Sequence, residues 1–188
     1  MSNTKSRLLT AVAVVLLGVS GASAALAQSD PMVGGAAMYP TKTIVENAVN
    51  SKDHTTLVAA VKAAGLVDTL SGPGPFTVFA PTNEAFDKLP PGTVQTLVQP
   101  ENKAMLVKIL TYHVVPGRLT GADLKRMIAA GGGKATLTTV EGEPLTVTEH
   151  GMGRLMLTDA KGGMSMITIS NVNQSNGVIH VVDSVLMP

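Results

Sequence analysis

Four histidines are the side chains whose chemistry could serve catalysis or metal binding: His54, His113, His150 and His180. No two of them are spaced as a His-x-x-x-His pair, and the chain has no cysteine to complete a zinc site. His113 and His180 each lie in an apolar stretch, where an imidazole is more often buried and bonded to backbone or hydroxyl groups than a ligand or catalyst. Asp183 follows His180 by three residues and falls on the opposite strand face. The sequence therefore predicts structural histidines and no metal site.

A group of methionines flanks segment 159–163, whose Asp and Gly residues predict a hairpin turn. The group comprises Met152, Met156, Met164 and Met166, with His150 nearby. Thioethers and imidazole suit Cu(I), so a copper site is one hypothesis. The other is that methionine fills gaps in a core that is poor in aromatic residues, which the irregular spacing favours.

Catalytic motifs are missing from the sequence. There is no Gly-x-Ser-x-Gly elbow, and the Gly-Gly-Gly-Lys run at 131–134 follows an expected helix instead of opening one, so it does not predict a phosphate loop. Glu141 and Glu143 are close together only at an expected turn, where a solvated face is the simpler interpretation. We predict that the chain is not an enzyme and needs no cofactor.

The first 27 residues have the layout of a secretory signal peptide. Lys5 and Arg7 precede an uncharged apolar run over 8–19, which is too short to span a membrane, and small-x-small cleavage motifs stand at 22–24 and 25–27. No second long apolar segment follows, so we expect no transmembrane anchor. The predicted location is the periplasm or the outside of the cell.

Charge and aromatic content narrow the class of partner. The chain has 14 basic and 13 acidic residues, and loss of the signal peptide removes Lys5 and Arg7, leaving the charges nearly balanced. Such a balance does not suggest a polyanion-binding surface. Two tyrosines, three phenylalanines and no tryptophan also disfavour stacking on single-stranded nucleic acid. We therefore predict no nucleic-acid partner.

The secondary-structure elements that must position these side chains change from helices to strands along the chain. Residues 28–40 are rich in small residues without a period, which predicts a flexible leader, and 41–188 form a single predicted domain. Helical periodicity dominates up to about residue 130, and strands dominate beyond it, which predicts an α+β fold. The expected strands are 76–80, 112–115, 135–140, 145–149, 155–158, 166–170 and 178–182.

The chain ends in an apolar strand introduced by Asn176 and Gly177. These two residue types tolerate positive φ, so the pair predicts a tight hairpin turn before strand 178–182. Such a terminal strand is expected to close the domain.

Three segments in this order resemble the fasciclin domain family. Residues 74–86 (GPFTVFAPTNEAF) resemble its first block, 112–117 (YHVVPG) its central Tyr-His block, and 176–188 its closing Asn-Gly-x-Ile-His-x-x-Asp-x-Val-Leu-x-Pro block. The resemblance covers nearly the whole chain after the predicted signal peptide. The matching positions of the first and last blocks that we expect to be structural are Phe76, Phe79, Pro81, Thr82, Asn176, Gly177, His180 and Asp183.

This resemblance implies a wedge-shaped β-sandwich with several helices packed at one side. It also implies a non-enzymatic role in contact with cell-surface or matrix molecules; the alternative is carriage of an apolar small molecule such as a lipid or pigment. In some animal fasciclin domains a Tyr-His segment with branched apolar neighbours is associated with integrin binding, and the matching residues are Ile109, Leu110, Tyr112 and His113. The competing interpretation is that these four side chains serve the core.

Overall fold

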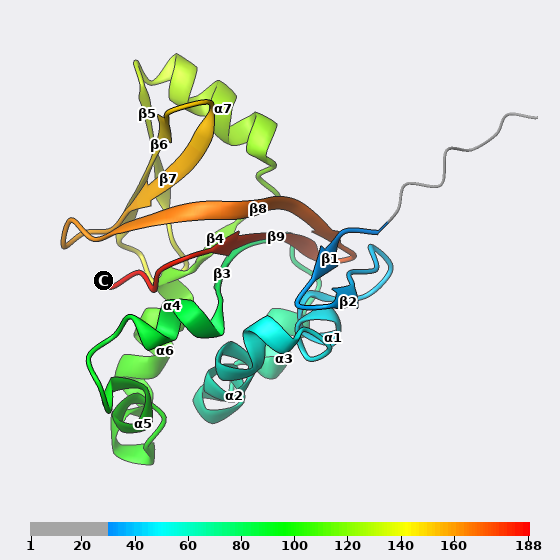
Figure 1. Ribbon diagram of the computed structural model, residues 1–188, viewed down its shortest axis with the longest axis vertical. Coiled ribbons are helices and arrows are strands. Elements are labelled where there is room, and N and C mark those ends of the chain that lie inside the picture. The colour runs from blue at the N-terminus through cyan, green and yellow to red at the C-terminus, as the bar shows by residue number, and fades with distance from the viewer. Residues whose placement is uncertain (1–29) are drawn as a thin grey trace, which may run out of the picture.

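The structure is a computed structural model that describes residues 30–188, so the predicted signal peptide lies outside the described residues. Figure 1 shows a layer of helices on one side of a curved sheet, with α7 covering the far end. The helices are α1 (Ile44–Ala48), η1 (Lys52–His54), α2 (Thr55–Ala64), α3 (Val67–Ser71), α4 (Asn83–Asp87), α5 (Thr93–Leu97), η2 (Pro100–Asn102), α6 (Lys103–Tyr112) and α7 (Gly121–Ala130). The strands are β1 (Met32–Val33), β2 (Ala36–Ala37), β3 (Phe76–Pro81), β4 (Val114–Pro116), β5 (Lys134–Thr138), β6 (Pro144–His150), β7 (Arg154–Thr158), β8 (Met164–Gln174) and β9 (Gly177–Val182).

Seven strands form one mixed sheet in the order β4-β3-β9-β8-β7-β6-β5. Only β3 and β9 pair in parallel within it. The 11-residue strand β8 carries register shifts on both sides of Ile169, and such bulges bend a strand. The bend brings the two edge strands, β4 and β5, close together. The amide of Val140, just after β5, donates to the Val114 carbonyl in β4 at 2.7 Å. The predicted α+β class is confirmed, and the sandwich is one sheet folded along β8.

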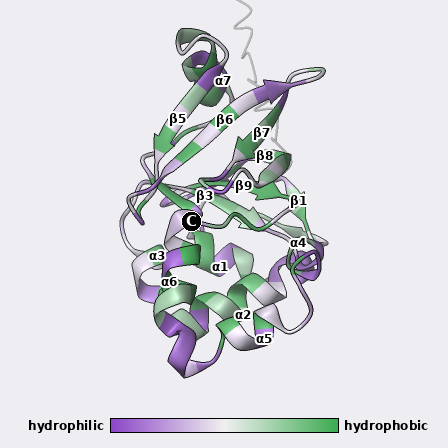
Figure 2. Cartoon of the chain, turned by 90° about the vertical axis from the view of Figure 1, so that its left-hand side faces the viewer, coloured by the Kyte–Doolittle hydropathy of each residue, from purple (hydrophilic) through white to green (hydrophobic). Residues whose placement is uncertain are grey.

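Two apolar cores lie on opposite faces of β3 and β9. Val78 and Ile179 pack into the core shared with the helices, whereas Phe79 and Val182 pack into the core enclosed by β5–β7 and α7. Figure 2 shows β3 and β9 between these two layers. The continuous apolar run at 76–80 had predicted a strand buried on both faces, and this is confirmed.

The hairpin before the last strand is present, but its turn lies one residue earlier than predicted. Gln174 pairs with Gly177, so Ser175 and Asn176 form the two-residue connection. Gly177 is the first residue of β9, where it pairs with Phe76 and approaches so closely that a Cβ atom would overlap the Phe76 carbonyl oxygen. Close packing of two backbones, rather than positive φ, therefore explains the glycine.

The side chain of Asn176 holds three segments together. Its Oδ1 accepts a hydrogen bond from the Ile44 amide at 3.0 Å, and its Nδ2 donates to the carbonyls of Leu70 at 2.8 Å and Gly72 at 2.9 Å. Asn176 thus satisfies backbone groups at the start of α1 and the end of α3, a role unrelated to turn conformation.

The prediction of a flexible leader is wrong for residues 31–40. Strands β1 and β2 form a hairpin, and Val33 and Met38 are buried in the core. Gly34 and Gly35 have φ of 58° and 75°, as a tight two-residue hairpin turn requires. The glycines that suggested flexibility therefore form a defined turn, and burial of the flanking apolar side chains holds the hairpin against the domain.

The Tyr-His segment is also assigned differently from the prediction. Tyr112 ends α6, His113 is its C-terminal cap, and β4 begins only at Val114. The core positions Leu106 and Ile109 recur at helical spacing and lead directly to His113. The helical period therefore continues through two residues that the apolar run had assigned to a strand.

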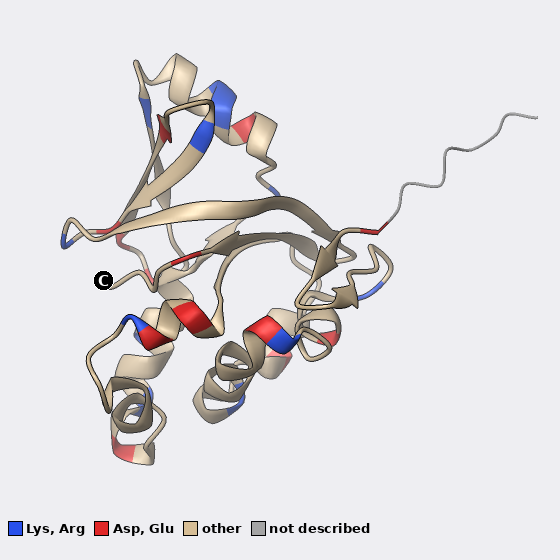
Figure 3. Ribbon diagram, viewed as in Figure 1, with Lys and Arg blue, Asp and Glu red and all other residues tan. Residues whose placement is uncertain are grey.

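Acidic and basic residues are interspersed along the ribbon of residues 30–188 in Figure 3. Across residues 30–188, none of the helices combines the length and the apolar character needed to cross a bilayer.

Candidate functional site

His113 joins the end of α6 to the C-terminal segment. Its Nδ1 lies 2.8 Å from the Ile109 carbonyl oxygen, and its Nε2 accepts a hydrogen bond from the Leu186 amide at 3.0 Å. Since a carbonyl oxygen only accepts, Nδ1 carries the proton. Burial lowers the pKa of His113 to about 4, which outweighs the opposing effects of the Ile109 carbonyl and the Asp159 carboxylate. His113 is therefore a neutral ring whose two nitrogens are already used.

His180, in β9, is also held by hydrogen bonds between both ring nitrogens and backbone groups. Its Nε2 lies 2.8 Å from the Leu119 carbonyl oxygen, its Nδ1 accepts from the Asn171 amide at 3.4 Å, and its ring stacks on Phe79 with centroids 5.7 Å apart. Burial lowers the pKa of His180, partly opposed by the Leu119 carbonyl. Neither His113 nor His180 has a free nitrogen for acid–base catalysis or metal binding.

The four residues of the integrin-type pattern all lie in the interior. Ile109, Leu110, Tyr112 and His113 are each at most 5% exposed. The Tyr112 hydroxyl donates to the Pro144 carbonyl at 2.8 Å and accepts from the Ala160 amide at 3.0 Å, so it ties α6 to the sheet. The structure therefore presents these side chains to the core and not to a partner surface.

We expect Tyr112→Phe to keep the fold and lower the free energy of unfolding by about 1–2 kcal/mol, because two hydrogen bonds are lost while the ring stays buried. Urea denaturation followed by circular dichroism measures this loss. Val98→Ala, at a partly exposed helix end, is the control and should change stability little. An unchanged unfolding midpoint in Tyr112→Phe would contradict the structural role of the hydroxyl.

The other motif positions form contacts around the β3–β9 pair. Thr82 caps α4 by accepting from the Ala85 amide at 3.3 Å, directly after Pro81 ends β3. Asp183 accepts from the Met166 amide at 2.8 Å, which holds β8 to the end of β9. Phe76 begins β3, and its amide donates to the Asn176 carbonyl at 3.0 Å.

The methionines do not gather around one point. Met156 and Met166 are paired across β7 and β8, whereas Met152 lies in the β6–β7 turn and is fully exposed. Met164 pairs with Thr158 at the end of the β7–β8 hairpin. None of the four is buried: Met164 is 62% exposed, and Met156 and Met166 are half-buried and belong to neither apolar core. The expectation that these methionines fill gaps in the core is therefore wrong. Among residues 30–188, no three His, Asp or Glu side chains group where they could hold a metal ion.

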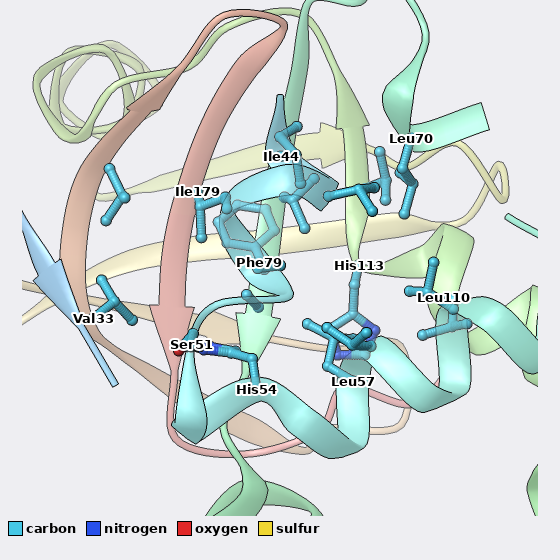
Figure 4. A pocket seen from close by; sticks show the side chains of 18 of the residues that line it. Val33, Ile44, Ser51, His54, Leu57, Leu70, Phe79, Leu110, His113 and Ile179 are labelled. Atoms are coloured by element: carbon cyan, nitrogen blue, oxygen red, sulfur yellow. Dashed lines mark hydrogen bonds between the residues drawn. The ribbon is translucent and has the colours of Figure 1, made fainter. Parts of the chain in front are cut away.

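An apolar cavity of about 50 Å³ lies between the helical layer and the strands β3 and β9. Figure 4 shows side chains from several elements facing it, including Val33, Leu57, Leu70, Phe79 and Ile179. The β1–β2 hairpin contributes part of its wall, together with α1, α2, α3 and α6. This cavity is the candidate binding site of the domain.

Ser51 and His54 supply polar groups at one end of the cavity. The Ser51 hydroxyl lies 2.9 Å from His54 Nδ1, and the two residues are 2% and 3% exposed. His54 Nε2 is the one buried side-chain nitrogen or oxygen of residues 30–188 without a hydrogen-bond partner. Burial lowers the pKa of His54, and the nearby Ala80 backbone and the Asp53 carboxylate oppose this effect.

Sequence reasoning named His54 among the four histidines but did not single it out. Its neighbours Lys52, Asp53 and Thr55 are exposed, as expected of a polar helix start. His54 is nevertheless buried, and the β1–β2 hairpin packs against the adjacent Ser51 and Lys52, with the Lys52 amide donating to the Gly34 carbonyl at 3.2 Å. The nearest signal in the sequence was the glycine pair that forms this hairpin turn.

Comparisons with known proteins identify the family to which this chain belongs. A fasciclin domain family model matches residues 52–188. Protein sll1483 of Synechocystis sp. is 44% identical over 182 residues, covering 96% of this chain and 92% of the relative. The chain therefore belongs to the fasciclin domain family, as the three sequence blocks had indicated.

Mycobacterial relatives and a solved structure extend this comparison. Immunogenic protein MPB70 of Mycobacterium bovis is 38% identical over 146 residues, covering 75% of this chain and 66% of the relative. Cell surface glycolipoprotein MPB83 of Mycobacterium bovis is 33% identical over 168 residues, covering 89% and 64%. A FAS1 domain pair from the insect cell adhesion molecule fasciclin I shares the fold with a TM-score of 0.70 and 21% identity; the match covers 78% of this chain and 51% of that chain.

Proposed function

We propose that this chain is an exported, non-enzymatic interaction module that contacts cell-surface or matrix molecules. The observation that carries the proposal is membership of the fasciclin family together with a relative named as a cell surface glycolipoprotein. The predicted signal peptide over 1–27 supports export to the periplasm or the outside of the cell. The engagement of both nitrogens of His113 and His180 with backbone groups supports a non-enzymatic role.

We expect a strain that lacks this protein to attach less well to surfaces than its parent. Expression of the wild-type gene in the deletion strain should restore attachment, and the purified protein should capture a partner from cell envelope or culture matrix. Heat-unfolded protein is the control for nonspecific capture, since it has the same composition without the folded surface. Unchanged attachment across several surface chemistries would count against the proposal.

A second candidate function is carriage of an apolar small molecule, which the apolar cavity favours. The cavity of about 50 Å³ is much smaller than typical ligand pockets of roughly 300–1,000 Å³. A whole lipid or pigment therefore exceeds it, and the cavity suits a small molecule or one end of a larger one. Native mass spectrometry and solvent extraction of protein purified from its own cells test carriage, and an empty protein would count against it.

A further inference from the structure

We propose that the cavity binds a small neutral molecule, or the end of a larger one, through an oxygen atom that accepts a hydrogen bond from His54 Nε2. The inference rests on the second candidate function and narrows it to a chemical class of ligand. It combines an apolar cavity with a single buried nitrogen that has no partner among residues 30–188. Figure 4 shows the Ser51 and His54 side chains meeting at one end of this cavity.

The direction of the hydrogen bond follows from Ser51. Its hydroxyl is buried, and its one hydrogen bond is to His54 Nδ1 at 2.9 Å. A buried hydroxyl proton needs an acceptor, so Ser51 donates and Nδ1 accepts. In the neutral ring the remaining proton then lies on Nε2. His54 therefore presents an N–H donor, and its ligand must supply an acceptor such as a carbonyl, ether or hydroxyl oxygen.

The walls select for a neutral ligand. Val33, Leu57 and Ile179 are typical of a lining that is otherwise almost entirely apolar. His113 also lines the cavity, but both of its nitrogens are bonded to backbone groups. An ammonium group placed here would lose its hydration without an opposite charge to replace it. The one charged lining residue, Lys62, is exposed to solvent and therefore offers a carboxylate little compensation. An uncharged oxygen needs only the one donor that His54 offers.

The size of the cavity limits the enclosed part of the ligand. Its volume of about 50 Å³ is smaller than the engineered cavity of about 150 Å³ that binds benzene. Only an oxygen-bearing group of a few atoms fits this limit, so the remainder of a ligand the size of benzene must lie outside the enclosed volume. Part of the wall comes from Val33, Met38 and Ser51, which precede the fasciclin match at residues 52–188. The site therefore depends on the segment that packs against the matched domain.

The test uses 2-butanone as probe and 2-methyl-1-butene as its control, because the alkene has nearly the same shape with a CH₂ group in place of the oxygen. Nuclear magnetic resonance of the ¹⁵N-labelled protein reports which ring nitrogen of His54 carries the proton. We expect a protonated Nε2 and saturable shifts of its signal and of the Val33 and Ile179 methyl signals on addition of the ketone. The alkene should bind roughly fivefold more weakly, the factor that one neutral hydrogen bond supplies.

His54→Leu keeps apolar bulk and removes the donor, so it should bind the alkene more tightly than the ketone, whose oxygen would be buried without a hydrogen bond. The tautomer measurement and the comparison of the two probes use the wild-type protein, so they decide the proposal even if this variant does not fold. An unprotonated Nε2, equal affinity for both probes, or no response to the ketone would overturn the proposal.

If the ketone binds at His54 but protein from cells carries no ligand, the His54 binding site is supported and the carrier function is not. If protein from cells carries a ligand but His54 does not respond to the ketone, carriage stands and the His54 site fails.

Discussion

Gly177→Ala is expected to lower the free energy of unfolding by about 4 kcal/mol or more, or to prevent folding, which is the upper tail for single substitutions. A Cβ atom at this position would overlap the Phe76 carbonyl oxygen and lie 2.9 Å from Ile44 Cδ1. The clash involves backbone in the β3–β9 pair, where both strands are buried on both faces, so local relaxation cannot relieve it. Thermal unfolding followed by circular dichroism, with soluble yield, measures the effect.

Gly142→Ala is the matched control for this experiment. Gly142 has φ of 108° in an exposed turn and no atom within 4 Å of a built Cβ, so only backbone strain of about 1–2 kcal/mol is expected. The comparison separates two explanations for the glycine after Asn176. If Gly177→Ala were no more harmful than Gly142→Ala, turn conformation would explain the residue and the close approach to Phe76 would not.

Acid is expected to destabilise this protein well above the pH at which carboxylates titrate. Burial lowers the pKa of His113 from 6.5 to about 4, so the unfolded chain binds a proton at this site more readily than the folded one. The stability contributed by the neutral ring is therefore complete above about pH 6.5 and is lost as the pH falls toward 4. His113 alone should lower the free energy of unfolding by about 2 kcal/mol between pH 7 and pH 5, and by about 3 kcal/mol below pH 4.

The lowered pKa values of His54 and His180 act in the same direction and steepen this dependence. Urea unfolding at a series of pH values from 7.5 to about 4.5 gives the slope, which reports the number of protons taken up on unfolding. His150→Gln is the control, because it removes an exposed histidine and leaves the buried rings in place. His113→Gln should reduce proton uptake by about one. A flat stability profile between pH 7 and pH 5 would show that the buried rings do not stay neutral.

Local patterns were sufficient to predict the strands β3 and β9 and the α+β order of elements. Residues 76–80 and 178–182 are short, nearly continuous apolar runs bounded by Gly, Pro or Asn, which favour strands buried on both faces. Three spaced blocks also predicted the fasciclin family, now shown by the match over residues 52–188. The boundary between α6 and β4 was missed because an apolar run at a helix end has the same composition as a buried strand.

The sequence by itself determined the class of element, the family and the expectation that His113 and His180 are structural, because these depend on neighbouring residues and on motif order. Only the tertiary structure decided what Asn176, Gly177 and His54 do. Asn176 bonds to Ile44 across 132 residues, and Gly177 is constrained by the backbone of Phe76. His54 is buried with an unpartnered Nε2 beside a segment that the β1–β2 hairpin contacts through the Lys52–Gly34 hydrogen bond. Contacts between segments far apart in sequence leave no local pattern, so they become visible only in the folded chain.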